Sequence, residues 1–179
     1  KLYLIYIMLK MIAIVGKNNG IGLKKAIPFS LLGPGRIKEH YDKYTIGGGN
    51  NAIIMGRKTE LQFPTLPKRD TLILSRTQNK NEKTFKSLNE IKDYGKKYNE
   101  LWILGGEEIF NYCIHDHDLK MILVTEIGKD VMSNCFFPEI PLSFKLAHNS
   151  RHKNEFFTYR HKIYMKSDDN YFIPPFVNL

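Results

Sequence analysis

The stretch Ala52-Ile53-Ile54-Met55-Gly56-Arg57-Lys58-Thr59 joins a continuous apolar run to a glycine, two cations and a hydroxyl. A short apolar run without alternation predicts a strand that is buried on both faces, and the residues after it predict the start of a helix. Cations and a hydroxyl at the carboxyl end of such a strand form a potential anion site. This stretch therefore predicts an α/β fold with an anion-binding edge.

Similar apolar runs recur along the chain and predict further buried strands at 12–15, 71–74, 101–104 and 121–124. Apolar spacing, a capping-box pair or a preceding glycine pair predicts helices between them at 36–44, 87–98 and 107–114. Residues 144–149 and 155–166 alternate apolar and polar side chains, which predicts an antiparallel hairpin. The expected fold is an α/β domain with a mostly parallel sheet that the hairpin completes.

Two further strand ends carry groups that suit an anion. Ser75 and Arg76 follow one apolar run, and Gly105 and Gly106 follow another. Glycines let a backbone approach a ligand closely, but a strand-to-helix turn also uses them for geometry alone. Because the carboxyl ends of parallel strands meet at one edge, these groups could converge on one polyphosphate cofactor. The alternative is that they are solvated loop residues. A dinucleotide fingerprint with three spaced glycines is absent, which disfavours a standard Rossmann site.

The composition sets outer limits. The chain has 179 residues, of which 42% are hydrophobic and 12% aromatic, which excludes a disordered chain and a multi-span membrane protein. A formal net charge of +9 favours an anionic partner, whether nucleic acid, acidic membrane or a phosphorylated small molecule. Two cysteines make no disulfide framework in a chain of this length, so we expect a reducing, cytoplasmic location.

The first fifteen residues are almost entirely apolar, interrupted after the first by Lys10 alone. A signal peptide or membrane anchor is one interpretation, and a buried strand with apolar residues before it is the other. The run is shorter than the roughly 20 residues that span a bilayer, and no small-residue cleavage site precedes Gly16. We therefore expect an apolar extension at 1–10, one domain at 11–166, and a tail or the start of a linker at 167–179.

The order and spacing of these motifs resemble dihydrofolate reductase from about Met11 to Lys166. The matching stretches are Ile12-Ala13-Ile14-Val15, Gly20-Ile21-Gly22, Ala26-Ile27-Pro28, 53–59 in the stretch above, Leu66-Pro67-Lys68-Arg69, Leu72-Ile73-Leu74-Ser75-Arg76, Ile103-Leu104-Gly105-Gly106, Val124-Thr125 and Phe136-Phe137-Pro138-Glu139-Ile140. The resemblance implies a three-layer sandwich around an eight-stranded, mostly parallel sheet. It also implies NADPH-dependent reduction of 7,8-dihydrofolate to tetrahydrofolate, which serves one-carbon and thymidylate metabolism.

The resemblance implies roles for individual residues. The cofactor would contact Ala13, Ile14, Ile21, Gly22, Gly56, Arg57, Lys58, Thr59, Leu74, Ser75, Arg76, Gly105, Gly106, Glu107, Glu108 and Ile109. Among these, Ala13 and Ile14 would hold the nicotinamide carboxamide, and Ser75 and Arg76 would accept the 2′-phosphate. The substrate would contact Ile12, Ala13, Tyr41, Phe63, Leu66, Arg69 and Leu104, with Arg69 on the α-carboxylate of its glutamate and Thr125 at the deep pterin end.

The catalytic carboxylate of the family has no counterpart at the matching position. It lies in the first helix, eight residues before a threonine and four before an aromatic residue, so Thr45 and Tyr41 both point to Ile37. Isoleucine can neither bind pterin N–H groups nor influence a proton. Glu39 is the nearest carboxylate, but two residues along a helix is a turn of about 200 degrees, so it could substitute only through a shifted helix. Phe29 replaces the family's loop tryptophan.

Three other interpretations stay open at this stage. The chain could bind NADPH but reduce pterins weakly or act on another substrate, because Ile37 replaces the acid. It could be the reductase half of a bifunctional reductase–thymidylate synthase. His115, Asp116 and His117 cluster as metal ligands do, and the basic stretch 80–97 could contact nucleic acid, but a polar loop and a solvated helix face explain both. We expect no metal, nucleic acid or membrane partner.

Overall fold

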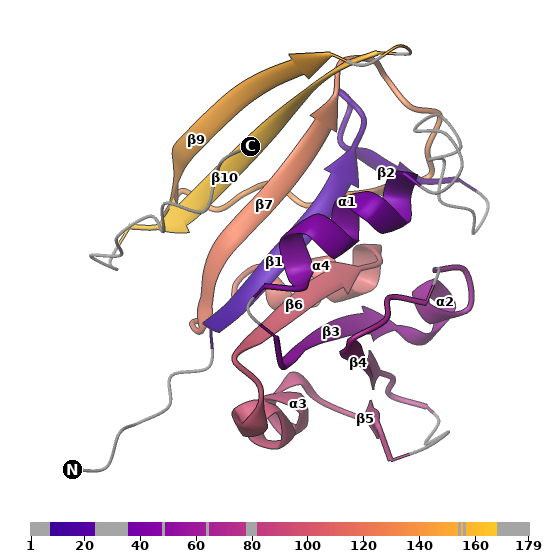
Figure 1. The fold of residues 1–179 in the computed structure, drawn as a ribbon, viewed down its shortest axis with the longest axis vertical. Helices are drawn as coiled ribbons and strands as arrows, with labels where there is room; N and C mark the ends of the chain where they lie inside the picture. The colour runs from indigo at the N-terminus through magenta and orange to yellow at the C-terminus, as the bar shows by residue number, and fades with distance from the viewer. Residues whose placement is uncertain are drawn as a thin grey trace.

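The computed structural model describes residues 8–23, 36–47, 49–63, 65–77, 82–153, 155 and 157–167, with the backbone alone for 36–38. Its centre is an eight-stranded sheet in the order β5-β4-β3-β6-β1-β7-β10-β9 (Figure 1). The strands of this sheet are β1 (Met8–Val15), β3 (Asn51–Gly56), β4 (Arg69–Leu74), β5 (Thr84–Phe85), β6 (Glu100–Gly105), β7 (Leu119–Ile127), β9 (Phe144–Lys153) and β10 (Thr158–Lys166). Neighbours from β5 to β7 run parallel, whereas β10 and β9 are antiparallel. The predicted mostly parallel sheet with a C-terminal hairpin is confirmed.

Helices cover both faces of the sheet. The helices are α1 (Arg36–Thr45), α2 (Arg57–Glu60), α3 (Leu88–Tyr94), the 3₁₀ turn η2 (Gly95–Lys97) and α4 (Glu107–Cys113). In Figure 1 α1 crosses one face in front of β1 and β6, and α4 lies behind them. Side chains alternate along β1 accordingly: Ile12 and Ile14 join the core under α1, while Met11 and Ala13 join the core under α3 and α4. This arrangement is the expected three-layer sandwich.

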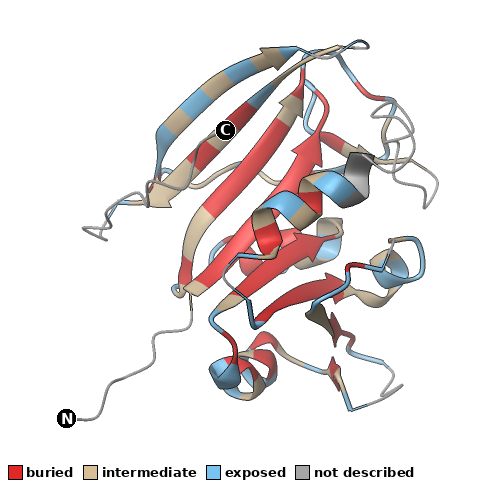
Figure 2. Ribbon diagram, viewed as in Figure 1, coloured by how far each residue is buried: buried red, intermediate tan, exposed pale blue. Residues whose placement is uncertain are grey.

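Burial follows the parallel and antiparallel parts of the sheet. Figure 2 shows β1, β3, β6 and β7 buried along most of their length, while the outer strand β9 alternates between exposed and partly buried residues. Strands covered on both faces need apolar residues at every position, whereas an edge strand needs them on one face only. The continuous runs and the alternating runs of the sequence therefore correspond to these two parts.

Some elements differ from the expectations. β1 begins at Met8, four residues earlier than predicted, and contains Lys10, whose ammonium pairs with Glu100 and lies 5.0 Å from the centroid of the Trp102 ring. This pairing explains how a cation is accommodated within an apolar strand. The predicted helix at 87–98 ends as α3 at Tyr94 and continues as the turn η2. Its start is as expected, because the Ser87 hydroxyl accepts from the backbone N–H of Glu90 at 3.2 Å.

Three short strands were not predicted. β5 extends the main sheet, and β2 (Gly20–Gly22) pairs with β8 (Cys135–Phe136) in a separate two-stranded sheet. Strands of two or three residues are too short to show a periodicity, so tertiary contacts alone define them. Within the described residues, no helix has both the length and the apolar character needed to cross a membrane.

Candidate active site

A cavity of about 1330 Å³ opens where β1, β3, β4 and β6 end. Most of the residues expected to contact cofactor or substrate line it: Ala13, Ile14, Ile21, Gly22, Tyr41, Gly56, Arg57, Lys58, Thr59, Phe63, Leu74, Ser75, Arg76, Leu104, Gly106, Glu107, Glu108 and Ile109. These residues come from segments distant in the sequence and meet because parallel strands place their carboxyl ends at one edge. The strand ends therefore meet at one cavity, and their contact with a cofactor stays a prediction.

The cationic side of the cavity carries Lys58 and Arg76, and Glu108 lies between them. Its two carboxylate oxygens are 3.6 Å from Lys58 Nζ and 3.8 Å from an Arg76 guanidinium nitrogen. All three side chains are at least 70% exposed, and such exposed pairs are worth only about 0–1 kcal/mol. A phosphate could therefore displace Glu108 from Lys58 and Arg76 with little loss of free energy.

The glycine pair lies between the strand β6 and the helix α4, and of the two expected cofactor contacts Gly106 lines the cavity whereas Gly105 does not. Gly105 has φ +104°, and a Cβ there would lie 2.5 Å from the Phe110 ring, so no larger residue fits. A Cβ on Gly106 would lie 3.0 Å from the Thr59 hydroxyl, which brings the start of α4 against that of α2. The peptide bond between the two glycines is cis. Glycine is thus required here by close packing as well as by backbone conformation.

Glu107 lines the cavity but also has a structural contact. One of its carboxylate oxygens accepts a hydrogen bond of 2.9 Å from the backbone N–H of Phe136 in β8. Because β8 pairs with β2, this bond ties the start of α4 to the segment that contains Ile21 and Gly22. Glu107 therefore helps to hold the cavity wall in addition to any contact with a cofactor.

The apolar side of the cavity is built by Tyr41 and Phe63. Their rings meet edge to face with centroids 4.9 Å apart. Ile12 and Leu66, both expected to contact substrate, are buried in the same core cluster but do not line the cavity. An apolar, aromatic slot next to a cationic edge suits a flat heterocycle joined to a charged group.

Arg69 lies outside the cavity lining and is already engaged. Its side chain has 0% exposure and forms an ion pair with Asp42. One guanidinium nitrogen donates to the Thr45 hydroxyl at 2.6 Å, and the other also donates to the Pro67 carbonyl at 2.9 Å. The fork expected to bind a substrate carboxylate therefore binds groups of the protein itself.

The residues expected at the catalytic acid position are only partly described. The backbone of Ile37 lies in α1, one turn before Tyr41, and its side chain is outside the described atoms. Glu39 in the same helix is exposed and does not line the cavity. Phe29 lies outside the described residues. Asp42, five residues after Ile37, is another carboxylate of this helix, and it too lies outside the cavity lining.

Thr125 is buried in a network that the sequence did not indicate. Its hydroxyl lies 3.2 Å from His40 Nε2 and 2.9 Å from His161 Nδ1, and the other nitrogen of His161, Nε2, lies 3.2 Å from the Tyr44 hydroxyl. His40 and Tyr44 come from α1, Thr125 from β7 and His161 from β10. The two imidazoles also stack, with centroids 5.7 Å apart.

Burial keeps both imidazoles neutral. It lowers the pKa of His40 to about 3, helped by His161 and Lys43, and lowers the pKa of His161 to about 4, helped by His152, Lys43 and His148. In the unfolded chain a histidine titrates near 6.5. Between these pH values the unfolded chain binds protons that the folded chain does not, so the free energy of unfolding falls as the pH falls.

We expect the melting temperature to drop on acidification from pH 6.5 to pH 4, and to drop less in His161→Phe, which removes one titrating ring and keeps the stacking. The control is His117→Phe, because the His117 side chain is 83% exposed. Thermal unfolding followed by circular dichroism across this pH range measures the effect. An equal pH dependence in wild type and His161→Phe would contradict it.

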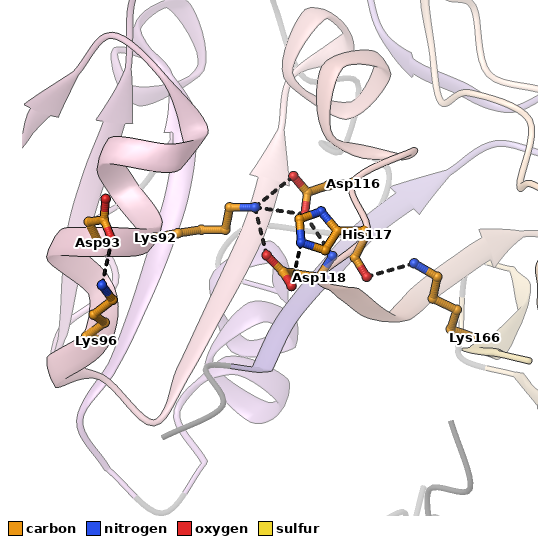
Figure 3. Close-up of polar contacts among 7 residues, drawn as sticks. All are labelled: Lys92, Asp93, Lys96, Asp116, His117, Asp118 and Lys166. Carbon is orange, nitrogen blue, oxygen red and sulfur yellow. Dashed lines mark hydrogen bonds and ion pairs between the residues drawn. The ribbon is translucent and has the colours of Figure 1, made fainter. Parts of the chain in front are cut away.

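The cluster considered as a metal site is a salt-bridge network. Lys92 of α3 places its ammonium 3.0 Å from Asp116 and 2.8 Å from Asp118, as Figure 3 shows. His117 lies 3.2 Å from Asp118. Asp116, His117 and Asp118 lie close enough together to hold an ion, whereas His115 of the predicted cluster is not among these three, and Lys92 already supplies positive charge to both carboxylates. The cluster precedes β7, at the end of the sheet opposite the cavity. It ties α3 to the start of that strand.

Several residues of the cavity were missed. They are Gln62, Thr77, Lys86, Phe110, Asn111, Tyr112, Asn134 and Cys135. Lys86 follows β5 directly and so repeats the pattern of a cation after a strand. That strand is too short to recognise as an apolar run, which is why the signal was not found.

The profile of the family described as dihydrofolate reductase matches residues 8–166. The dihydrofolate reductase of Aedes albopictus is 30% identical over 159 residues, which cover 78% of this chain and 83% of that protein. The dihydrofolate reductase of Rattus norvegicus is 28% identical over 152 residues, which cover 75% of this chain and 80% of that protein.

A bifunctional dihydrofolate reductase-thymidylate synthase of Paramecium tetraurelia is 26% identical over 172 residues, which cover 87% of this chain and 34% of that protein. The sheet order, the cavity at the strand ends and the family profile over residues 8–166 agree with one another. This chain belongs to the dihydrofolate reductase family.

Proposed function

We propose that this protein reduces 7,8-dihydrofolate to tetrahydrofolate with NADPH as the reductant. The observation that carries the proposal is a cavity with cations at one side and Tyr41 and Phe63 at the other. Family membership and the relatives named dihydrofolate reductase support it. The reductant would lie along the cationic side and the pterin would lie in the aromatic slot.

The residues of the cavity fit NADPH. Arg57, Lys58 and Arg76 suit its phosphates, and the guanidinium of Arg76 beside Ser75 suits the 2′-phosphate. Gly106 lines the cavity and leaves the backbone at the start of α4 open to a bound group, whereas the space beside Gly105 is filled by the Phe110 ring. When bound, NADPH supplies the hydride that pterin C6 receives. Ile14, Tyr41, Phe63 and Leu104 would orient the pterin and exclude water around it.

The direct test is dihydrofolate-dependent oxidation of NADPH by the purified wild-type protein, with NADPH binding measured separately by fluorescence titration. We expect both binding and turnover. A protein that binds NADPH but does not oxidise it with dihydrofolate would instead match the second candidate function. That candidate is a reductase of weak or altered pterin specificity. Two observations favour it: Ile37 stands at the acid position, and Arg69 is already paired with Asp42.

Arg76→Ala is expected to weaken NADPH binding by about tenfold and to leave NADH binding nearly unchanged, because only NADPH carries the 2′-phosphate. A hydrogen bond to a charged group is worth about 1.5–3 kcal/mol, and the high exposure of Arg76 places it at the low end. Fluorescence titration with both nucleotides measures the change. The matched control is Arg151→Ala on β9, which does not line this cavity. An equal loss for both nucleotides would assign Arg76 to the common phosphates.

We propose the cytoplasm as the compartment, since Cys113 and Cys135 are both free thiols. The likeness to a bifunctional protein keeps a fused thymidylate synthase as a proposal for the partner. Mass measurement of the natural gene product decides this question, because a fused protein would be far heavier than 20.9 kDa.

A further inference from the structure

The network of His40, Thr125, His161 and Tyr44 addresses a requirement of the proposed function, on which this inference rests. Reduction adds a hydride to C6 and a proton to N5 of the pterin. Ile37 stands where the family has its acid, and Glu39 is exposed away from the cavity lining. Another group must therefore bring the proton to the pterin end of the cavity.

The four groups form an unbroken line of polar contacts, which we call the proton wire. Tyr44 Oη lies 3.2 Å from His161 Nε2, His161 Nδ1 lies 2.9 Å from Thr125 Oγ1, and Thr125 Oγ1 lies 3.2 Å from His40 Nε2. Each of these distances is that of a hydrogen bond between the two atoms. Each of the two inner groups, Thr125 and His161, uses a donor and an acceptor within the line.

The hydrogen bonds of this line can all point in one direction or all in the other. In one direction Tyr44 donates to His161, His161 donates from Nδ1 to Thr125, and Thr125 donates to His40. In the other, His40 donates from Nε2 to Thr125, Thr125 donates to His161, and His161 donates from Nε2 to Tyr44. Both arrangements satisfy every group, because a neutral imidazole carries one donor and one acceptor and a hydroxyl carries both. Passing one proton along the line converts the first arrangement into the second.

One end of the wire, His40, lies near the cavity, and the other end, Tyr44, lies near solvent. His40 packs against Tyr41 with ring centroids 5.4 Å apart, and Tyr41 lines the cavity. Thr125 pairs with Ile14 on the neighbouring strand β1, and Ile14 also lines the cavity. Tyr44 at the other end is partly exposed, as His40 is also. The wire therefore runs directly behind the wall formed by Ile14 and Tyr41.

We propose that this wire carries the proton for pterin N5 from solvent at Tyr44 to His40, which packs against the cavity-lining Tyr41. His40 releases the proton on Nδ1 toward N5 through a water, and takes the Thr125 hydroxyl proton on Nε2. Thr125 takes the proton from His161 Nδ1, His161 Nε2 takes the proton from Tyr44, and Tyr44 takes one from water. One proton enters and one leaves, so the step balances with the hydride that C6 receives.

The surroundings keep the wire neutral, as it requires. The groups that face the two imidazoles are Lys43 and Tyr44 on α1, Tyr159 on β10, and His148 and His152 on β9. The lysine and the further histidines disfavour a positive charge on either ring, and no carboxylate is among the groups that shift them. Burial likewise raises the pKa of Tyr44, which therefore stays protonated at its end of the wire.

Thr125→Val tests the wire, because it removes the hydroxyl and keeps the shape of the side chain. We expect kcat/KM for dihydrofolate at neutral pH to fall about 100-fold, a magnitude typical of lost general acid catalysis, and NADPH binding to stay unchanged. The loss should shrink at acidic pH, where the substrate arrives already protonated. Thr125→Ser keeps the hydroxyl and should restore the wild-type profile. Thr71→Val on β4 is the matched control for the substitution itself.

Two further measurements keep the wire falsifiable. His161→Phe keeps the stacked ring and breaks the line at its centre, so it should show the same pH-dependent loss if Thr125→Val does not fold. Nitrogen NMR of labelled histidines, without cofactor, should show neutral rings of His40 and His161 in exchange between tautomers, and Thr125→Val should leave each ring in one tautomer.

The outcomes separate the two proposals. An active wild type with a Thr125→Val variant of unchanged pH profile, or of equal loss at every pH, would overturn the wire and leave the proposed function standing. Fixed tautomers in the wild-type spectrum would overturn the wire whatever the activity. A wild type that binds NADPH but never reduces dihydrofolate would overturn the proposed function itself, and with it the role of the wire in that reaction.

Discussion

Ile37→Asp is expected to raise kcat/KM for dihydrofolate by about 100-fold. The substitution places a carboxylate at the position that, by resemblance, holds the acid of the family, one turn before Tyr41 in α1. General acid–base groups contribute about 10²–10⁴-fold, and the low end applies because the proton wire already serves the wild type. A carboxylate would also bind pterin N–H groups, which isoleucine does not. Dihydrofolate-dependent NADPH oxidation measures the gain.

The control for this prediction is Ile37→Asn, which has nearly the shape of aspartate and cannot carry a proton. We expect it to gain little. An equal gain in Ile37→Asn would mean that orientation of the pterin, rather than proton transfer, limits the wild type. No gain in either variant would show that residue 37 does not face the pterin, and that the register between Phe29 and Ile37 differs from the family.

Asp42→Asn is expected to lower the KM for dihydrofolate by about tenfold or more, with kcat nearly unchanged. In the wild type the carboxylate of Asp42 occupies the buried guanidinium of Arg69, so a substrate carboxylate must displace it. Hydrogen bonds to charged groups contribute about 1.5–3 kcal/mol, or about 10- to 100-fold in affinity. Asparagine keeps an acceptor for Arg69 but removes the competing charge.

The readout that identifies the cause is the choice of substrate. A dihydropterin without the glutamate carries no carboxylate, so its KM should be the same in wild type and Asp42→Asn. Asp93→Asn is the matched control, since Asp93 of α3 forms an exposed pair with Lys96 of η2. A fall in KM for both substrates would place the effect in the pterin slot. An unchanged KM for dihydrofolate would show that Arg69 does not receive its carboxylate.

The strands and their ends were readable from the sequence because their signals are local. A buried parallel strand needs apolar side chains at consecutive positions, and the groups that follow it lie at the open edge of the sheet. Gly56, Arg57, Ser75, Arg76 and Gly106 were placed in this way, and the cavity contains all of them. The fold and the outline of the site therefore followed from short stretches.

The partners of the charged and polar side chains were not readable. Arg69 was expected to bind a substrate carboxylate and instead binds Asp42, which is 27 residues away in the sequence. Thr125 was expected at the pterin end, but nothing local indicated that His40 and His161, 85 and 36 residues away, would meet at its hydroxyl. His161 reaches Thr125 only because β10 pairs antiparallel with β7 in this register.

By itself, then, the sequence determined the α/β class, the order of the parallel strands along the chain and the cationic and glycine-bearing strand ends, since each depends on neighbouring residues. Only the tertiary structure decided which side chains are already paired, as Arg69 is with Asp42 and Lys92 is with Asp116 and Asp118. It also decided that His40, Thr125 and His161 share one line of hydrogen bonds. A hydrogen bond or ion pair depends on distances of a few ångströms between distant segments, and those distances exist only once the strands have paired and α1 has packed on the sheet.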